Sequence, residues 1–271
     1  MTDTPLLEVR DLHRFFGTLV ALHKVSATFH TAQITCLLGD NGAGKSTLIK
    51  ILSGLDRPDS GEMLIEGETV RLNSPREAFD RGIATVYQDL AVLPDMSIDR
   101  NFVLGMEPYH SFFGIKVLNR KRSAEIATEE LSKIGIEVRD TNQLVGTMSG
   151  GERQSLAIAR AEYRGAKALI LDEPTAALGV KEAAIVLRHI LHAKDRGLAV
   201  IFITHNVRHA LTVGDKFVVL NRGEVQGTFD RDDVDERSLS DLMGGGEEFY
   251  QLRDQLQASR GDGHKDLGDS V

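Results

Sequence analysis

A Gly-rich run with one lysine, GDNGAGKST at residues 39–47, is the segment of this chain whose residue types most directly suggest chemistry. It has the spacing G-x-x-x-x-G-K-[ST], in which the glycines let the backbone curl so that consecutive N–H groups face a phosphate. Lys45 is placed to reach terminal phosphates and Ser46 to ligate Mg²⁺. A Gly-rich turn is the alternative, and the strand-like run before the loop and the helical run after it make it less favoured. The candidate phosphate-binding residues are Gly39, Asp40, Asn41, Gly42, Ala43, Gly44, Lys45, Ser46 and Thr47.

An acidic pair, Asp172 and Glu173, ends the apolar run ALILDEP. If this run is a strand whose carboxyl end lies beside the loop, Asp172 is suited to hold Mg²⁺ through water. Glu173 is then suited to orient or deprotonate an attacking water. Taken alone, such a pair is more often a helix cap or a turn, so its interpretation depends on the other motifs.

Two further polar residues follow apolar, β-like runs: Gln88 in ATVYQDL and His205 in VIFITHN. Gln88 is suited to reach a γ-phosphate, its Mg²⁺ or the lytic water, and His205 is suited to donate to the γ-phosphate. In isolation, a loop Gln is usually solvated and a His at a strand end is usually structural.

The run MSGGERQ at residues 148–154 begins a helix-like segment. Ser149, Gly150 and Gly151 present a hydroxyl and N–H groups at a helix N-terminus, which makes a second candidate anion site. A simple helix cap is the alternative interpretation. Because one chain with one nucleotide hardly needs two such sites, the redundancy hints that two chains pair.

The elements that must position these residues indicate an α/β protein with a mostly parallel sheet and an antiparallel edge. Short β-type runs alternate with polar turns in residues 5–38, and two later apolar runs flank a helical run. Strand, helix and parallel strand imply a right-handed crossover within one sheet. Upstream, apolar Ile126, Leu131 and Ile134 recur at helical spacing, and the region around them is predicted to be mainly helical.

These patterns divide the chain into a nucleotide-binding core, an inserted helical subdomain that carries the second anion site, and a polar, irregular C-terminal extension. The last ten or so residues are expected to be disordered because they are polar and Gly-rich. The predicted boundaries are 5–89 and 165–230 for the core, 90–164 for the helical subdomain and 231–271 for the extension.

Composition narrows the class of protein. The chain has 271 residues, 41% of them hydrophobic, which suffices for a large core. A formal net charge of −8 disfavours a general nucleic-acid binder, although a local basic patch is still possible. The single cysteine, Cys36, lies in an apolar run and is interpreted as a core residue. We expect no signal peptide and no membrane-spanning helix, so any work at a membrane requires docking by a partner.

The ordered set of GDNGAGKST, Gln88, MSGGERQ, the acidic pair and His205 resembles the nucleotide-binding subunit of ATP-binding cassette (ABC) transporters over about residues 5–230. The resemblance implies a P-loop NTPase fold, with a RecA-like core plus an inserted helical subdomain. It also implies ATP and Mg²⁺ as cofactors and ATP hydrolysis coupled to transmembrane transport. Five motifs in the family's order are more specific than the phosphate loop, which a kinase or GTPase also carries.

The resemblance also assigns roles by position. Phe16 matches the aromatic residue on which adenine stacks. Ser149 and Gly151 match residues that contact the γ-phosphate bound by the opposite subunit, so two ATPs are sandwiched between two head-to-tail copies. Met148 stands where the family usually has Leu, a volume-conserving change. Gly179 stands where the family usually has Asp, and this missing carboxylate bears on the coupling of the two sites.

Two segments, YQDLAVLPDMSIDRNFVLGMEP and EPTAALGVKEA, resemble bacterial monosaccharide importers of the ribose, xylose and fructose types. One cassette per chain matches the fructose type. The resemblance implies membrane permease subunits, a periplasmic sugar-binding protein, and a peripheral place on the cytoplasmic face of the inner membrane. In such systems Gln88 and the helical segment after it contact the permease. Candidate lining residues, which are as well explained by packing inside the subdomain, are Val92, Leu93, Met96, Ile98, Phe102 and Val103.

Other functions remain open at this point. One alternative is an ABC ATPase for another transport substrate, and a less favoured one is a soluble ABC ATPase in translation or DNA repair. A third is a subunit that binds ATP without hydrolysing it, which would be expected to lack Glu173 or His205. The sequence does not identify the sugar, because selectivity resides in the binding protein and the permease.

Overall fold

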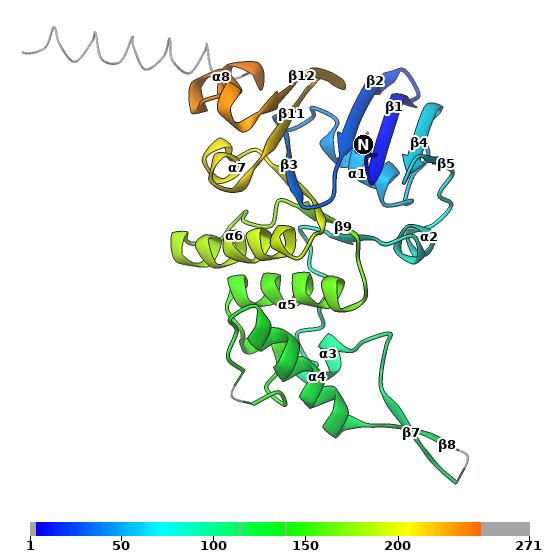
Figure 1. The fold of residues 1–271 in the computed structure, drawn as a ribbon, viewed down its shortest axis with the longest axis vertical. Helices are drawn as coiled ribbons and strands as arrows, with labels where there is room; N and C mark the ends of the chain where they lie inside the picture. Colours follow the sequence, from blue (N-terminus) through cyan, green and yellow to red (C-terminus); the bar gives the residue numbers. More distant parts are fainter. Residues whose placement is uncertain (1–3, 114, 139, 245–271) are drawn as a thin grey trace, which may run out of the picture.

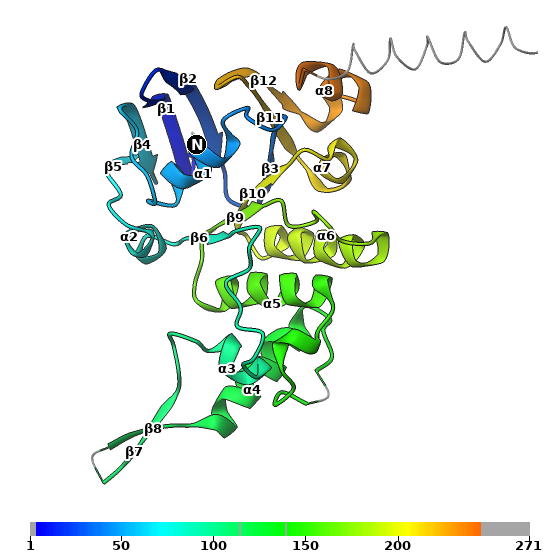
Figure 2. The ribbon, with the colours of Figure 1, turned by 180° about the vertical axis from the view of Figure 1, so that it is seen from behind.

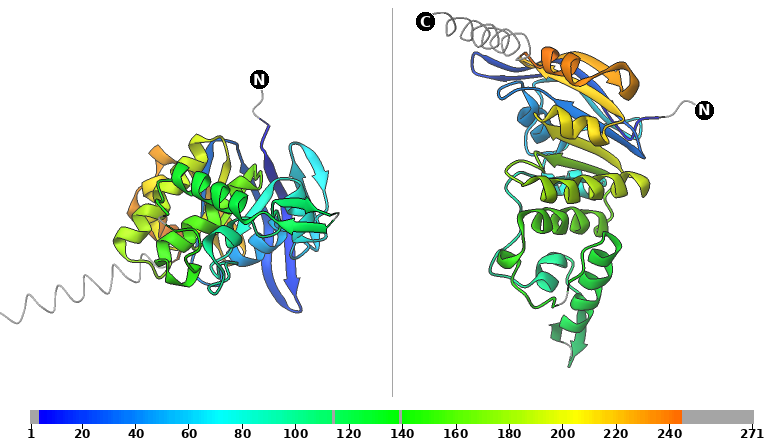
Figure 3. Two further views of the ribbon diagram at one scale, coloured as in Figure 1. Left: turned by 90° about the horizontal axis from the view of Figure 1, so that it is seen from below. Right: turned by 90° about the vertical axis from the view of Figure 1, so that its left-hand side faces the viewer.

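A computed structural model of the chain describes residues 4–113, 115–138 and 140–244, and Figure 1 presents its fold. Two β-sheets occupy one end of the molecule and a helical region occupies the other, as the side view in Figure 3 shows. The last ten residues, for which disorder is expected, lie outside the described residues.

The central sheet has six strands in the order β12-β11-β3-β10-β9-β6. All neighbouring strands pair in parallel except β12, which pairs antiparallel with β11. Buried on both faces, the inner strands are near-continuous apolar runs, as expected for a parallel sheet covered on both sides. The strands are β3 (Gln33–Leu38), β6 (Ile83–Val86), β9 (Ala168–Asp172), β10 (Ala199–Thr204), β11 (Lys216–Asn221) and β12 (Glu224–Asp230).

A second, antiparallel sheet has the order β2-β1-β4-β5 and forms the expected antiparallel edge. Its buried residues share one apolar core with helix α1 and with one face of the central sheet. Helix α1 is therefore fixed from two sides, and so is the loop that precedes it. The elements are β1 (Leu7–Phe16), β2 (Leu19–Phe29), α1 (Lys45–Leu52), β4 (Ser60–Ile65), β5 (Glu68–Val70) and the nearby α2 (Pro75–Asp80).

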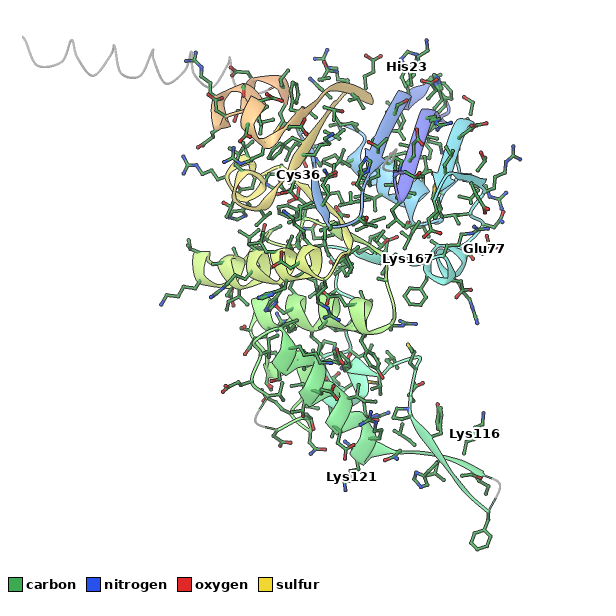
Figure 4. The ribbon with its side chains drawn as sticks, viewed as in Figure 1. His23, Cys36, Glu77, Lys116, Lys121 and Lys167 are labelled. Carbon is green, nitrogen blue, oxygen red and sulfur yellow. The ribbon has the colours of Figure 1, made fainter. Side chains whose placement is uncertain are left out.

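Helices cover the opposite face of the central sheet, and together they bury a second apolar core (Figure 2). Cys36 lies in this core, as its apolar surroundings in the sequence predict, and burial raises the pKa of its thiol well above the ordinary value. Figure 4 labels it among the buried strands. The covering helices are α5 (Gly150–Tyr163), α6 (Val180–Asp195), α7 (Val207–Val213) and α8 (Glu236–Leu242).

The helical region packs around a third apolar core. Ile126, Leu131 and Ile134 are all buried there, as their spacing predicts. Two 3₁₀ turns complete the described elements, one before α5 and one before α8. The helices of this region are α3 (Ile98–Phe102) and α4 (Arg120–Lys133), and the two turns are η1 (Val145–Thr147) and η2 (Arg231–Asp233).

Two short segments differ from the expectation. Residues 109–112 and 115–118 pair as a β-hairpin of β7 (Tyr109–Phe112) and β8 (Ile115–Leu118) inside the region predicted to be mainly helical. The hairpin is hard to recognise because its residues with described burial are exposed or only partly buried, so the burial that produces an apolar-polar alternation is missing. Helix α8 lies in the extension predicted to be irregular. Its Leu239, together with the following Met243, is buried against the second core, which stabilises this polar helix.

Candidate active site

The predicted motifs meet at one edge of the central sheet. Strands β3, β10, β9 and β6 are consecutive neighbours and run parallel, so their carboxyl ends lie side by side. Gly39 follows β3, His205 follows β10, Asp172 ends β9, and Gln88 lies two residues after β6. In open α/β sheets, ligands bind at this edge of the strands. The sheet order therefore gathers four predicted site residues from distant parts of the chain.

The phosphate loop needs glycine at two positions for lack of space. A Cβ on Gly39 would lie within van der Waals overlap of the Leu220 carbonyl oxygen, and one on Gly44 would lie 2.7 Å from the Ala21 carbonyl oxygen. Gly44 also has φ +105, a conformation that L side chains rarely adopt. These contacts with β11 and β2 fix the loop, while its residues Asp40 to Gly42 extend outward and are partly or fully exposed. The arrangement fits a cradle of backbone amides at the start of α1.

Lys45 lies inside this loop rather than in solvent. Its ammonium group donates to the carbonyl oxygens of Gly39 at 2.5 Å and of Asp40 at 3.0 Å, and the residue is buried. Burial lowers the pKa of the Lys45 amine, and nearby carboxylates, first that of Glu173, oppose the shift. The amine is thus held at the loop by its own backbone, with few conformations left to lose when it meets a phosphate.

Asp172 carries an unfavourable negative charge in this structure. Burial raises the pKa of its carboxyl above the ordinary value, the adjacent Glu173 raises it further, and Lys45 opposes the shift. A divalent cation would relieve both burial and like-charge repulsion. Ser46, one residue into α1, is exposed and offers a hydroxyl oxygen. Mg²⁺ takes oxygen ligands and often uses only one or two from protein beside phosphates, so these two residues fit it.

Glu173 is the most constrained residue of the site. Its backbone has φ +48, in the left-handed region that non-Gly residues seldom adopt. Its Oε1 accepts from the His205 backbone N–H at 3.0 Å and from the His205 Nδ1 at 2.7 Å. Its Oε2 accepts from the Thr204 hydroxyl at 3.2 Å. An ionised carboxylate only accepts, so Nδ1 of His205 carries the proton in this bond.

The Thr204 hydroxyl is itself oriented. It accepts from the backbone N–H of Asn206 at 3.0 Å, so its proton is directed to Glu173. Each carboxylate oxygen has two lone pairs. Among the described residues, Oε1 of Glu173 meets two donors and Oε2 meets one, which leaves Oε2 able to accept a further hydrogen bond, such as that of a water. No motif indicated Thr204, because its role depends on β10 pairing with β9.

Phe16 lies at the end of β1 and is 46% exposed. The guanidinium of Arg14 lies 4.6 Å from the centre of the Phe16 ring, and Arg14 is anchored by Asp56 at 2.8 Å and Asp59 at 3.2 Å. One ring face is therefore supported by a cation, an arrangement that orders an aromatic platform. The sequence did not indicate Arg14, because the two aspartates that fix it come from a loop some forty residues away.

The second predicted anion site lies at the start of α5. The geometry there is compatible with both interpretations of Ser149, a helix cap and an anion-binding residue. The Ser149 hydroxyl accepts from the Glu152 backbone N–H at 3.3 Å, and the Glu152 carboxylate accepts from the Ser149 N–H at 2.7 Å. This reciprocal pair is a capping box. Ser149 is nevertheless exposed, and Gly151 lies so close to Glu182 of α6 that a Cβ would lie 3.2 Å from its carbonyl oxygen.

Within one chain, the start of α5 does not join the phosphate loop. Figure 1 and Figure 3 show α5 separated from α1 by the layer that contains β9 and α6. Gly179, which replaces the family's usual Asp, begins α6 and is exposed. Its N–H donates to the Glu182 carboxylate at 3.3 Å, and a Cβ would find no atom closer than 3.9 Å, so the position has room for a side chain.

A cleft of about 590 Å³ lies between α2 and α5, next to the segment that follows β6. Tyr87, beside Gln88, lines it and donates its hydroxyl to Ser53 at 2.8 Å. Gln88 itself is exposed. Gln88 follows Tyr87 directly in the chain and is not among the residues that line the cleft.

None of the six apolar residues predicted as possible groove lining lies in this cleft. Ile98, Phe102 and Val103 are buried in the core of the helical region, so for them the packing interpretation is the correct one. Their spacing in the sequence is that of a helix face, which turns toward α4 and α5. Leu93 is 47% exposed, and Val92 and Met96 are partly buried.

The chain matches the family model described as ABC transporter over residues 22–176. It is 43% identical over 238 residues to the xylose/arabinose import ATP-binding protein XylG of Sulfolobus acidocaldarius, covering 88% of this chain and 93% of that protein. It is 41% identical over 227 residues to the fructose import ATP-binding protein FrcA of Rhizobium meliloti, covering 82% and 87%. A ribose import ATP-binding protein RbsA 2 of Escherichia coli O157:H7 is 34% identical, and the match covers 90% of this chain but 47% of that protein.

Two solved structures share the fold. One is the ADP conformation of an ATP-binding cassette of an ABC transporter, with a TM-score of 0.76, 25% identity, and coverage of 91% of this chain and 98% of that one. The other is a dimeric post-hydrolysis state of an ATP-binding cassette bound to ADP and Pi, with a TM-score of 0.67, 25% identity, and coverage of 83% and 98%. The family model, these relatives and the motifs at the strand edge agree. The chain belongs to the ABC transporter family as an ATP-binding cassette.

Proposed function

We propose that this cassette hydrolyses ATP to power the uptake of a small sugar, a monosaccharide, across the inner membrane. The observation that carries the proposal is the strand edge where the phosphate loop, Asp172, Glu173 and His205 lie together. The relatives named for xylose/arabinose, fructose and ribose import support the sugar class.

In the proposed ATP site, the loop amides and Lys45 hold the terminal phosphates, and Phe16 receives the adenine. Ser46 and Asp172, with Gln88, are the residues that would hold Mg²⁺, which when bound supplies positive charge against the phosphate oxygens. Glu173 accepts a proton from the attacking water through Oε2, and its orientation is kept by Thr204 and His205.

The site is completed by a second copy of the chain. Ser149, Gly150 and Gly151 are the residues proposed to contact the γ-phosphate across the dimer. Support comes from the exposure of Ser149, from the distance of α5 from the loop within one chain, and from the similar dimeric cassette with ADP and Pi. Closure by a partner makes hydrolysis depend on assembly, which is how a cassette avoids consuming ATP alone.

The proposed membrane partner is a permease that docks in the cleft between α2 and α5, beside Gln88. No helix among the described residues has the length and apolar character to cross a bilayer. In this proposal the permease holds the chain peripherally on the cytoplasmic face, and a periplasmic sugar-binding protein supplies the sugar from the far side. The proposed domains are a nucleotide-binding core of residues 5–89 and 165–230, a helical subdomain of residues 90–164, and a polar C-terminal extension of residues 231–271.

The test is ATP hydrolysis by the cassette assembled with its permease in vesicles that enclose the sugar-binding protein. A panel of xylose, arabinose, fructose and ribose is offered to the binding protein. The expected result is a several-fold stimulation by one sugar, abolished by Lys45→Ala. Stimulation by none of these sugars, but by another class of solute, would overturn the sugar assignment and leave the ATPase assignment standing.

A further inference from the structure

Exposed apolar side chains gather on the β7–β8 hairpin. Tyr109 is 55% exposed, Phe113 is 90% exposed, Ile115 is 67% exposed and Val117 is 39% exposed. The hairpin pairs with no third strand among the described residues, and it projects from the end of the molecule farthest from the two sheets (Figures 1 and 2). A lone two-stranded hairpin is marginally stable in water. The exposed apolar side chains therefore indicate a surface that contacts another molecule or a membrane.

The charge of this segment is opposite to that of the whole chain. Residues 109–122 contain two lysines and two arginines and no acidic residue, whereas the chain carries a formal charge of −8. Arg120 pairs with Asp99 at 3.2 Å and Arg122 with Glu125 at 3.2 Å. Lys116 and Lys121 are exposed, and Figure 4 shows both on the projecting end of the molecule. The hairpin and the start of α4 therefore combine apolar side chains with cationic ones.

We propose that the β7–β8 hairpin and the first turn of α4 bind the anionic lipid surface of the membrane's cytoplasmic leaflet. This inference rests on the proposed function, because it requires the cassette to work at that membrane. Aromatic and aliphatic side chains flanked by lysines suit an anionic interface, where each lysine is attracted by the negative surface potential.

The position of the hairpin agrees with binding to the lipid surface. Gly105 and Met106 line the cleft proposed for the permease, and β7 begins three residues later. The hairpin thus leaves the cassette at the edge where the membrane subunit docks. Met106 is itself 47% exposed, which extends the apolar surface from the cleft toward the hairpin.

The positive charge of the hairpin favours anionic lipid over the permease as its binding partner. The cytoplasmic loops of membrane proteins carry an excess of Lys and Arg, so they would repel Lys116 and Lys121. The cytoplasmic leaflet is negative and attracts them. The acidic remainder of the cassette suits the permease loops, and the basic hairpin suits the lipid around them.

Flotation of the full chain with vesicles tests the proposal. Vesicles of phosphatidylcholine and phosphatidylglycerol in equal amounts are compared with vesicles of phosphatidylcholine alone. We expect binding to the anionic vesicles that Lys116→Glu with Lys121→Glu weakens by about thirtyfold or more. The matched control, Lys24→Glu with Arg71→Glu, makes the same charge change at an exposed position of β2 and at the exposed residue that follows β5, and should bind as the parent does.

A second measurement uses the absence of Trp from the sequence. Phe113→Trp places a single Trp at the hairpin, and its emission should shift to the blue with anionic vesicles. Leu55→Trp, exposed in the loop after α1, should not shift. No flotation with anionic vesicles, or flotation unchanged by the lysine reversals, would overturn the proposal.

The detergent-solubilised complex separates this inference from the proposed function. There, sugar-stimulated ATP hydrolysis by the Lys116→Glu, Lys121→Glu variant should equal that of the parent, because no bilayer is present. Loss of stimulation in detergent would mean that the hairpin contacts the permease instead of lipid, and would also overturn the proposal. Failure of sugar stimulation in the parent itself would count against the proposed function alone.

Discussion

The two regions of the proposed ATP site, the carboxyl edge of the central sheet and the start of α5, are built in different ways. At the carboxyl edge of the sheet, Lys45 is buried and bonded to its own loop, and Glu173 is held by three donors in a left-handed backbone conformation. At the start of α5, Ser149 is exposed, and its polar groups are satisfied by its own capping box. Glu173 at the first end is ordered by residues more than thirty positions away, whereas Ser149 at the second end is ordered by contacts within one helical turn.

This difference separates two tasks. In the proposed site, the sheet edge is preorganised to bind nucleotide and to position Glu173 as the base, so it needs little rearrangement on its own side. The start of α5 presents a rigid, exposed surface at a distance from that edge, which suits recognition of a nucleotide held by another copy. Changes at the first end should therefore act on chemistry within one chain, and changes at the second should act only through assembly.

Glu173→Gln should have the largest effect, because it removes the base and keeps the shape of the side chain. We expect hydrolysis to fall about 1000-fold, while ATP binding is retained and the nucleotide-bound dimer accumulates. Phosphate release, nucleotide titration and size-exclusion chromatography measure the three quantities. Turnover near that of the parent would show that Glu173 is not the base.

Ser149→Arg should act only in the assembled protein. A bulky cation at the proposed dimer contact should lower hydrolysis about 100-fold by removing one half of the phosphate site, without weakening ATP binding to the isolated chain. Ser132→Arg, exposed at the end of α4, is the matched control and should hydrolyse ATP normally. If Ser149→Arg leaves activity untouched in the full complex, the two ends do not cooperate across a dimer.

Thr204→Val should have a smaller effect, because it keeps the side-chain shape and removes only the hydroxyl, which donates to the Glu173 carboxylate and accepts from the Asn206 N–H. A hydrogen bond to a charged group corresponds to a fall of about tenfold in kcat, with little change in KM because Thr204 contacts no nucleotide in the proposed arrangement. Thr204→Ser should restore the rate. An unchanged rate, or a change in KM alone, would mean that Glu173 needs no positioning from β10.

Gly179→Asp should have the smallest effect, and it tests whether the start of α6 couples the two regions. The position has space and an ordinary backbone conformation of φ −67, and Asp is a good N-cap, so we expect a gain of a few tenths of a kcal/mol in the free energy of unfolding. The turnover rate should stay within about twofold, while the Hill coefficient for ATP changes because the missing contact between subunits is restored. Thermal melts and ATP titrations check this, and an unchanged Hill coefficient would remove Gly179 from the coupling of the two sites.

Much of the site was predictable from the chain alone. The apolar runs that end at Asp172 and before His205 are buried strands, and a parallel sheet necessarily places such ends on one edge. The arrangement around Glu173 was not predictable, because Thr204 lies 31 positions away and reaches it only when β10 and β9 pair in the observed register. The β7–β8 hairpin was not predictable either, because short strands whose side chains are largely exposed leave no periodic pattern in the sequence.

The sequence by itself determined the chemistry: glycines at fixed offsets, a lysine, an acidic pair and a second Gly-rich helix start specify a phosphate site through local backbone geometry. Only the tertiary structure decided which of these segments lie together in one chain and which lie apart. Strand order and register bring Lys45, Glu173 and His205 together, and the layer of β9 and α6 keeps Ser149 apart from them. The physical reason is that local motifs fix what a segment can bind, whereas contacts between distant segments depend on how the whole sheet pairs and packs.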